Sequence, residues 1–279
     1  MKLRNNKRNF FEENGFIILK NIISKKKINQ IQKAIISRSK IYLNKKTNIK
    51  SFNDKNFHKD LIKLKKKDPK KFGSFYDSVQ KSLVLYSILT DNKLISEVCF
   101  VSKLKKENIS INGENIRMDM PHDKLHKLDW HQDRSYYFQN RDGNKGLVIW
   151  IPLINITNKI GPMKTCEKSH KLDFISNYQK KISSRNSSTQ RSVDFDKKNF
   201  KIINLNVNCG DVILMNKNTI HASGANISNL IRFSLQIRAH DLMDPDYLSF
   251  RYKIYYNLND IKQMKKKGID VSDVEVFSK

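Results

Sequence analysis

A histidine and an aspartate that could bind one metal ion lie two residues apart, at His131 and Asp133. On an extended strand, residues i and i+2 point to the same face, so both side chains could reach the same ion. A metal ion needs a third protein ligand, and His221 is the best candidate in the chain. Because a His-x-Asp triplet arises often by chance, this pattern carries weight only with support from other residues.

Arg232 provides that support, since it follows His221 by eleven residues on the polar side of an alternating segment. Two histidines and one carboxylate on one side of an octahedral ion, with the other positions open, are typical of non-haem Fe(II) oxygenases. Oxygenases of the oxoacid-dependent kind also hold a dicarboxylate, and a guanidinium suits its distal carboxylate. Ser223 could add a hydroxyl donor. Without His221 nearby, Arg232 would be interpreted as an ordinary strand-surface arginine.

Further polar residues are predicted to face the same cavity. Asn115, Arg117 and Asp119 share one face of an alternating segment, and this face would line the cavity if the metal-binding strand lies next to it. The candidates for substrate contact are Arg117, Tyr136, Tyr137, Trp150, Gln236 and Arg238. The two arginines, if they face the cavity, favour a substrate with a carboxylate or phosphate group. For each candidate a purely structural role is the alternative.

The segments that position these residues change character near residue 109. Before it, apolar residues recur at helical spacing in 28–36, after a candidate N-cap at Ser24, and in two helices between 75 and 101. Residues 43–72 are Lys-rich with few apolar residues, which predicts a surface excursion with one short helix. After residue 109 come short β-type runs, among them the apolar run 147–153 and the alternating run 231–238.

This order of elements predicts a mainly β, α+β fold, with an antiparallel double-stranded β-helix (a cupin-like jelly roll) and a helical layer outside it. We expect a single domain over 1–279, with a largely helical layer in 1–108, the jelly-roll core in 109–240 and a C-terminal extension in 241–279. Residues 172–200 are predicted to form a lid loop, with passive disorder as the alternative, because 183–190 has nothing to put into a core.

The formal net charge of +27 would ordinarily suggest nucleic acid or an anionic membrane as a partner. The lysines are spread along the chain with abundant Asn and Ile, so A/T-rich codons can account for much of this excess. There is no recognisable nucleic-acid module, secretory signal or run of about 18 apolar residues. The three cysteines form no C-x-x-C pair, which predicts reduced thiols. We therefore expect a cytoplasmic monomer or homodimer that acts on a small molecule and binds neither nucleic acid nor membrane.

In these motifs the chain resembles the phytanoyl-CoA dioxygenase family of Fe(II)/2-oxoglutarate oxygenases, from Phe11 through Arg238. The matching pieces, in chain order, are Glu-Asn-Gly-Phe at 13–16, Trp-His-Gln-Asp at 130–133, the apolar strand with Trp150, Gly-Pro-Met at 161–163, Ser-His-Lys at 169–171, Gly-Asp at 210–211 and His-x-Ser at 221–223 followed by Arg232. Their shared order and spacing are far more specific than any one motif.

The resemblance implies Fe(II) as the metal, and 2-oxoglutarate and O2 as co-substrates. It implies that the Fe(II) ligands are His131, Asp133 and His221, and that the 2-oxoglutarate contacts are Arg232 and Ser223, with Asn115 and Asp119 as further co-substrate-facing residues. The implied reaction hydroxylates a C–H bond and converts 2-oxoglutarate to succinate and CO2. In related halogenases a small residue replaces the carboxylate ligand, so the aspartate favours hydroxylation over halogenation.

One turn departs from the family pattern. The family usually has a Pro-Gly-Ser-His-like turn, whereas this chain has Glu-Lys-Ser-His at 167–170. We expect His170 to order this turn rather than to bind the metal.

Two other functional classes remain open. A non-catalytic, cupin-like metal-binding protein would not consume 2-oxoglutarate, and a basic nucleic-acid-binding protein would keep its oligonucleotide at high salt. The resemblance does not name the substrate, because members of the family act on acyl-CoA esters, amino-acid derivatives, phosphonates and natural-product intermediates.

Overall fold

The computed structural model describes residues 2–43, 49, 51–80, 82–123, 127–136, 146–172, 174–175, 177–181, 189–244, 262, 265–266 and 268. In chain order the helices and strands are α1 (Lys2–Asn14), β1 (Phe16–Leu19), α2 (Lys25–Leu43), α3 (Lys55–Lys67), α4 (Pro69–Gln80), α5 (Leu83–Leu89), α6 (Asn92–Ser102), β2 (Ile109–Asp119), β3 (Gly146–Pro152), β4 (Met163–Cys166), β5 (Asn177–Lys181), β6 (Thr189–Val193), β7 (Ile202–Leu205), β8 (Val212–Asn216), β9 (His221–Ser223) and β10 (Arg232–Asp241). Four short 3-10 helices lie between them: η1 (Lys106–Asn108), η2 (Asp133–Tyr136), η3 (Ser169–Lys171) and η4 (Lys197–Asn199).

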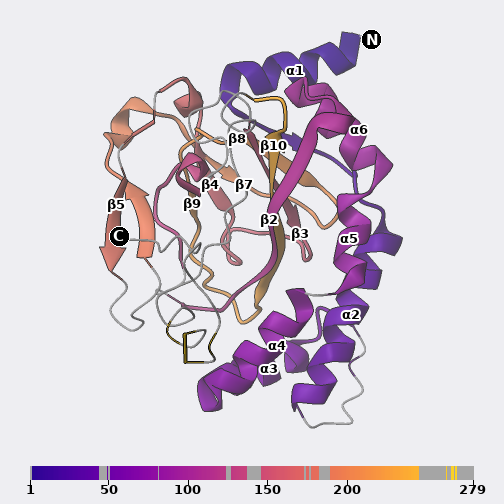
Figure 1. The fold of residues 1–279 in the computed structure, drawn as a ribbon. Coiled ribbons are helices and arrows are strands. Elements are labelled where there is room, and N and C mark those ends of the chain that lie inside the picture. The colour runs from indigo at the N-terminus through magenta and orange to yellow at the C-terminus, as the bar shows by residue number, and fades with distance from the viewer. Residues whose placement is uncertain are drawn as a thin grey trace.

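Two antiparallel sheets form the centre of the molecule, and helices cover its outside (Figure 1). The larger sheet has the strand order β1-β8-β3-β10-β2, and the smaller one has the order β7-β4-β9. This α+β arrangement of antiparallel sheets is consistent with the double-stranded β-helix that the sequence predicts. None of the described helices is long and apolar enough to span a membrane.

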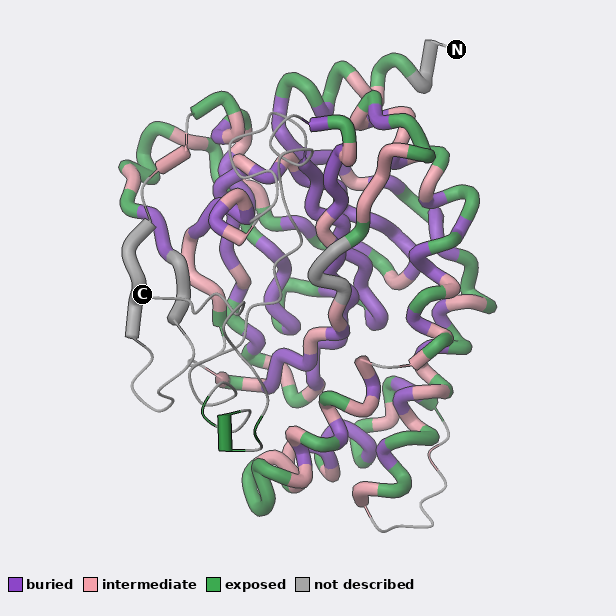
Figure 2. Tube along the Cα trace, viewed as in Figure 1, coloured by how far each residue is buried: buried purple, intermediate pink, exposed green. Residues whose placement is uncertain are grey.

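The apolar core extends from α1 to the end of β10. On β10 and just before it, Ile231, Phe233, Leu235 and Ile237 are fully buried, as the alternating pattern requires. Burying these side chains beneath the helices fixes which face of β10 is left for the polar residues. Buried residues accordingly run through the centre of the tube in Figure 2, and exposed residues follow its outer turns.

His58 joins the helical layer to the start of β10. Its Nδ1 accepts a hydrogen bond from Ile231 N at 2.9 Å, and its Nε2 lies 2.9 Å from Phe52 O. Since a carbonyl can only accept, Nε2 carries the hydrogen and the imidazole is neutral. The ring is fully buried and also packs edge-on against Phe233.

One edge of the larger sheet is β2, and Gln80 at the end of α4 covers part of it. The Gln80 amide donates from Nε2 to Ile116 O at 2.8 Å and accepts from Ile116 N at 2.7 Å. The side chain thus satisfies both backbone groups of a residue that, among the described strands, has no strand partner on that side.

The helical layer is more extensive than the sequence analysis predicts. Instead of one short helix, residues 43–72 contain α3 and the start of α4, and their buried side chains include Phe57, Leu61 and Phe72. Three helices, α4 to α6, cover the region in which two were expected, although the break near Thr90 is as predicted. The predicted cap is present, since Ser24 Oγ accepts from Lys27 N at 3.3 Å.

The predicted lid region is described only in part. Strands β5 and β6 pair antiparallel within it, and Phe195 and Phe200 after them pack near Trp130. These described parts are therefore more ordered than a plain loop. The Ser-rich stretch 182–188 and most of the C-terminal extension lie outside the described residues.

Candidate metal centre

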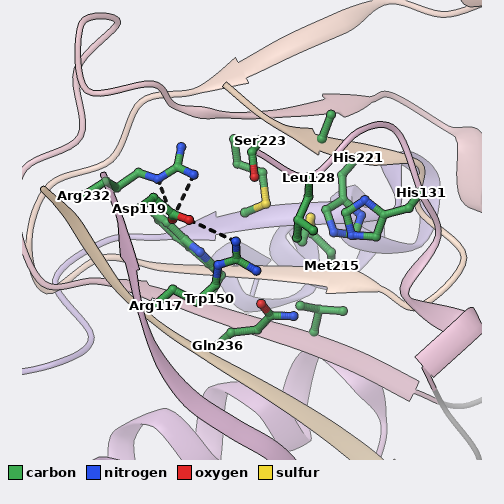
Figure 3. A pocket seen from close by; sticks show the side chains of 13 residues that line it. Arg117, Asp119, Leu128, His131, Trp150, Met215, His221, Ser223, Arg232 and Gln236 are labelled. Carbon is green, nitrogen blue, oxygen red and sulfur yellow. Dashed lines mark hydrogen bonds and ion pairs between the residues drawn. The ribbon is translucent and has the colours of Figure 1, made fainter. Parts of the chain in front are cut away.

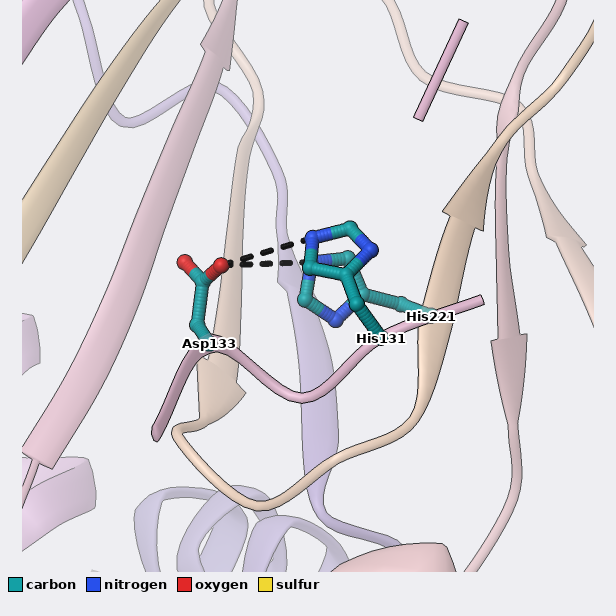
Figure 4. A group of neighbouring side chains, drawn as sticks. All are labelled: His131, Asp133 and His221. Carbon is teal, nitrogen blue, oxygen red and sulfur yellow. Dashed lines mark ion pairs between the residues drawn. The ribbon is translucent and has the colours of Figure 1, made fainter. Parts of the chain in front are cut away.

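Three side chains that could hold one metal ion meet between the two sheets. His131 Nε2 lies 3.4 Å and His221 Nε2 lies 4.0 Å from Asp133 Oδ1. The three ligand atoms all lie within 4.8 Å of one another, and all three residues are buried. Figure 4 shows both imidazoles turned toward the same carboxylate oxygen. The structure therefore brings together the three residues that the sequence analysis selected as ligands.

The local backbone of this cluster differs from the extended strand that was predicted. His131 and His221 form an isolated antiparallel bridge, with two backbone N–H to O hydrogen bonds of 3.0 Å. Asp133 instead begins the 3-10 helix η2. Between the ligands, the buried Gln132 donates to Asn218 O at 2.9 Å and accepts from Ile175 N at 3.0 Å. The prediction of a shared strand face was wrong, but the turn still points His131 and Asp133 to one place.

Backbone carbonyls orient both imidazoles. His131 Nδ1 lies 2.7 Å from Asp129 O, and His221 Nδ1 lies 2.9 Å from Thr219 O. Each Nδ1 must carry a hydrogen because a carbonyl only accepts, which leaves Nε2 as the nitrogen of each ring that can bind a metal ion. Burial and the neighbouring His131 lower the pKa of His221 to about 4, which keeps this ring neutral at ordinary pH.

Asp133 uses its two oxygens differently. Oδ2 accepts from Gln236 Nε2 at 3.3 Å and from Arg238 Nε at 3.2 Å. Oδ1, the atom that faces the imidazoles, has no hydrogen-bond partner within the described part of the chain. Burial alone would raise the pKa of this carboxyl, but the Arg238 guanidinium and the two imidazoles hold it well below its usual range.

These contacts fit a divalent metal ion. Asp133 Oδ1 and His131 Nε2 are both buried and lack hydrogen-bond partners in the described structure, although buried polar atoms rarely remain unpaired. A metal ion between them would satisfy both atoms. Two imidazole nitrogens and one carboxylate oxygen also form the donor set that binds Fe(II) while leaving positions open for other ligands.

Beside the metal centre, Asp119 links two arginines. Its Oδ2 accepts from Arg232 Nε at 3.1 Å and Nη2 at 3.0 Å, and its Oδ1 accepts from Arg117 Nη2 at 2.9 Å. Arg232 Nη1 donates to the carbonyls of Gly161 and Gly224. Burial opposes ionisation of Asp119, but the two guanidinium groups lower its pKa to about 2. Each nitrogen of the Arg232 guanidinium therefore already has a protein partner.

One pocket connects these two clusters, with Arg232 and Asp119 at one end and the two imidazoles at the other (Figure 3). Its apolar lining consists of Leu128, Val148, Trp150, Met163, Met215 and Ala222. Its volume is about 30 Å³, which suits one or two water molecules rather than a dicarboxylate. Entry of a larger molecule therefore requires side chains to move.

Comparison with known proteins identifies the family. The family model described as Phytanoyl-CoA dioxygenase (PhyH) matches residues 11–234. The chain belongs to the PhyH family. It is therefore an Fe/2-oxoglutarate-dependent oxygenase by class. A search of curated proteins finds no match.

Solved structures with this fold include enzymes that hold iron or 2-oxoglutarate. The epimerase SnoN, in complex with Fe3+, alpha ketoglutarate and nogalamycin RO, is 12% identical with a TM-score of 0.60, over 87% of this chain and 85% of SnoN. EvdO2 from Micromonospora carbonacea var. aurantiaca, complexed with 2-oxoglutarate, is 16% identical with a TM-score of 0.54, over 86% and 93% of the two chains. EctD from S. alaskensis, with bound Fe, is 16% identical with a TM-score of 0.56, over 85% and 76%. At these identities the likeness shows a shared fold.

The remaining candidates of this PhyH-family chain divide into two groups. Arg117, Trp150, Ser223 and Gln236 line the pocket. Arg238 and Tyr136 lie next to the metal centre instead, where the Tyr136 ring is 6.1 Å from the His131 ring and 4.9 Å from the Arg238 guanidinium. Asn115 pairs with Gln236 in the sheet but is not among the pocket residues, and Tyr137 lies outside the described residues.

His170 orders a turn, as predicted. Its Nε2 lies 3.0 Å from Glu12 O, and its ring packs directly over Gly15. Gly15 has a φ of +80°, and an added Cβ would lie 2.4 Å from His170 Nδ1. This contact joins the start of β1 to the turn after β4, close to the segment that carries His221, because Thr219 Oγ1 donates to Gly15 O at 2.7 Å.

Two features of the site were missed in the sequence analysis. Gln132 was not assigned a role, yet its side chain fixes the turn between two of the candidate ligands. The contact between Arg238 and Asp133 was also missed, although Arg238 follows Arg232 by an even number of residues on one strand and must share its face.

Proposed function

We propose that this protein hydroxylates an unactivated C–H bond of a small molecule that bears an acidic group, using Fe(II), 2-oxoglutarate and O2. The observation that carries the proposal is the convergence of His131, Asp133 and His221, in which Asp133 Oδ1 and His131 Nε2 are buried and lack hydrogen-bond partners among the described residues. In such a reaction one oxygen atom of O2 enters the new C–OH group and the other enters succinate, while CO2 leaves.

Each side chain has a defined task in this proposal. His131, Asp133 and His221 hold the metal, which when bound supplies the activation of O2 that is coupled to oxidation of 2-oxoglutarate. Asp129 O and Thr219 O keep the Nε2 lone pairs of the two imidazoles directed at it. The apolar wall that includes Trp150 and Met215 excludes water from the reacting atoms.

For 2-oxoglutarate we assign Arg232 to the distal carboxylate and Ser223 to a supporting hydrogen bond. A guanidinium at the far end of a pocket from the metal suits a dicarboxylate that must reach both. Because Asp119 now occupies two donors of Arg232, binding requires the Asp119 to Arg232 pair to rearrange. Arg117, which holds the other oxygen of Asp119, can keep this carboxylate when Arg232 turns to the co-substrate.

The acidic group of the substrate is assigned mainly to Arg117, which lines the pocket. Arg238 suits this task less well because it is not among the residues that line the pocket. The solved structures with this fold include an epimerase, a carbocyclase and a monooxygenase. The reaction products must therefore be analysed for epimerisation and ring closure as well as for hydroxylation. We further propose that residues 1–279 act as one domain, since one large cluster of buried apolar side chains extends from Phe11 to Ala239.

The test is an anaerobic titration of metal-free protein with Fe(II) and 2-oxoglutarate, in which the visible charge-transfer band of the chelate is recorded. We expect a band in the wild type, none in His131→Ala or His221→Ala, and a much higher 2-oxoglutarate requirement in Arg232→Ala. His122→Asn is the matched control, because this histidine is exposed, lies outside the site and has a φ of +56° that asparagine tolerates. Absence of the band in metal-loaded wild type would refute the cofactor assignment.

A further inference from the structure

The one-sided bonding of Asp133 bears on how it binds a metal. Two donors from β10 reach Oδ2, at 3.2 Å from Arg238 and 3.3 Å from Gln236, and none reaches Oδ1. Because the two residues are separated by one position on the strand, their side chains project from the same face. The carboxylate is therefore held in one rotation, with a single oxygen directed at the two imidazoles.

We propose that Arg238, assisted by Gln236, is a positioning residue that keeps Asp133 a one-oxygen ligand and thereby preserves an open coordination position. This inference rests on the proposed function. An octahedral ion offers six positions, of which three protein atoms take half. A 2-oxoacid that binds through two oxygens takes two more and leaves one for O2. Asp133 bound through both oxygens would fill that last position.

Arg238 is itself held in place by the segment that carries Asp133. The Tyr136 ring lies 4.9 Å from the guanidinium, at the opposite end of η2 from Asp133. The edge of the same ring faces the His131 imidazole at a centroid distance of 6.1 Å. One short helix thus supplies both the carboxylate that Arg238 binds and the aromatic face on which Arg238 rests. This arrangement limits the rotation of the carboxylate and of the guanidinium together.

The charge of Arg238 supports the same role. Asp133 is fully buried, and a buried carboxylate without a cation is strongly disfavoured. On its Oδ1 side it faces the Nε2 atoms of two imidazoles, whose Nδ1 hydrogens point to the carbonyls of Asp129 and Thr219. Arg238 supplies a permanent positive charge on the Oδ2 side, with its Nε 3.2 Å from that oxygen, and so compensates the buried carboxylate where the imidazoles do not reach it.

The experiment uses Co(II) as a probe, because its visible absorption reports coordination number without any turnover. Arg238→Met is compared with Arg238→Lys and with Arg8→Met. Arg8 is the matched control, since its Nε also donates one hydrogen bond, to Phe100 O at 2.9 Å, and its guanidinium also lies over an aromatic ring, at 4.2 Å, but far from the site. Thermal unfolding of each variant shows whether the fold is kept.

We expect Arg238→Met to bind Co(II) about 10- to 100-fold more weakly than wild type, with a changed absorption spectrum, as for other residues that orient metal ligands. Arg238→Lys should recover part of the affinity, and Arg8→Met should match wild type in both readouts. In an Asp133→Asn background, Arg238→Met should change the affinity by less than about 2-fold, because its partner is already altered.

Two results would overturn the inference. One is wild-type affinity and spectrum in Arg238→Met. The other is an equal loss of affinity in the Asp133→Asn background, which would mean that Arg238 acts on the fold and not through Asp133. If Arg238→Met does not fold, a wild-type Co(II) affinity and spectrum in Arg238→Gln, which removes the charge, counts against it. Failure of wild type to bind Co(II) or Fe(II) would instead refute the proposed function.

Discussion

The carboxylate of Asp119 lies against the guanidinium of Arg232, with its Oδ2 3.1 Å from Nε and 3.0 Å from Nη2. Both side chains are buried, and they are directly opposite each other in the pairing of β2 with β10. A protein carboxylate thus occupies the donors that we assign to the distal carboxylate of 2-oxoglutarate. The co-substrate and Asp119 should compete for Arg232.

Asp119→Asn tests this competition. The variant should lose about 3 kcal/mol of stability in the absence of ligand, because breaking a buried ion pair leaves charge uncompensated. Saturating 2-oxoglutarate should then raise its unfolding temperature more than that of wild type, since the ligand supplies the missing anion. Thermal unfolding with and without 2-oxoglutarate measures both the loss of stability and the rise in unfolding temperature that the ligand causes. An equal or smaller ligand effect in Asp119→Asn would show that the two carboxylates do not compete.

Gly15→Ala should destabilise the protein by about 2 kcal/mol or more. The residue has a φ of +80°, and the new Cβ would meet His170 Nδ1 at 2.4 Å and Thr219 Oγ1 at 2.8 Å. Gly73→Ala is the matched control, because Gly73 lies within α4 with nothing near its added Cβ, and alanine there should stabilise by up to about 1 kcal/mol. Urea unfolding measures both changes, and similar values for the two variants would contradict the structural account of Gly15.

His58 should make stability depend on pH. Burial lowers its folded pKa below the ordinary value of 6.5 because the protonated ring loses its hydration. The protonated ring could also no longer accept from Ile231 N. As pH falls, the unfolded chain binds this proton first, so the stability that is present above pH 6.5 is lost progressively as pH falls through the folded pKa. His240, whose pKa burial lowers to about 4, acts in the same direction over a wider range.

The measurement for His58 is urea unfolding of metal-free protein at two pH values, one above and one below 6.5. His58→Gln should be destabilised at the higher pH by about 1 to 3 kcal/mol, through a buried donor left without its acceptor. The His58→Gln variant should also lose less stability than wild type between the higher and the lower pH. His122→Asn should lose as much as wild type. The same pH dependence in His58→Gln and wild type would assign the effect to other groups.

The candidate metal cluster could be selected from sequence because its residues are chemically distinctive and belong to a set of motifs in fixed order. The local backbone conformation could not be predicted, because the spacing of His131 and Asp133 is the same in an extended strand and in a bridge followed by a 3-10 turn. The Asp119 to Arg232 pair depends on the register between β2 and β10, which is a property of the assembled sheet.

The helical layer shows a similar limit. Lysine-rich composition concealed α3, whose buried side chains Phe57 and Leu61 lie four residues apart and form one face of the helix. A narrow apolar stripe is enough when long lysine side chains keep their charged ends in water. The alternation in 231–238 was easier to interpret, because strict period two specifies both the strand and its apolar face.

Gln80 has a consequence for the protein in concentrated solution. Its amide group presents one N–H and one C=O to Ile116, as a peptide unit of an adjacent strand would. An open edge at this point would offer the same two groups to the β2 strand of another copy, which is how sheets extend into aggregates. One glutamine side chain thus takes the place of a strand here, and it leaves Ile116 with no backbone group for a second molecule to pair with.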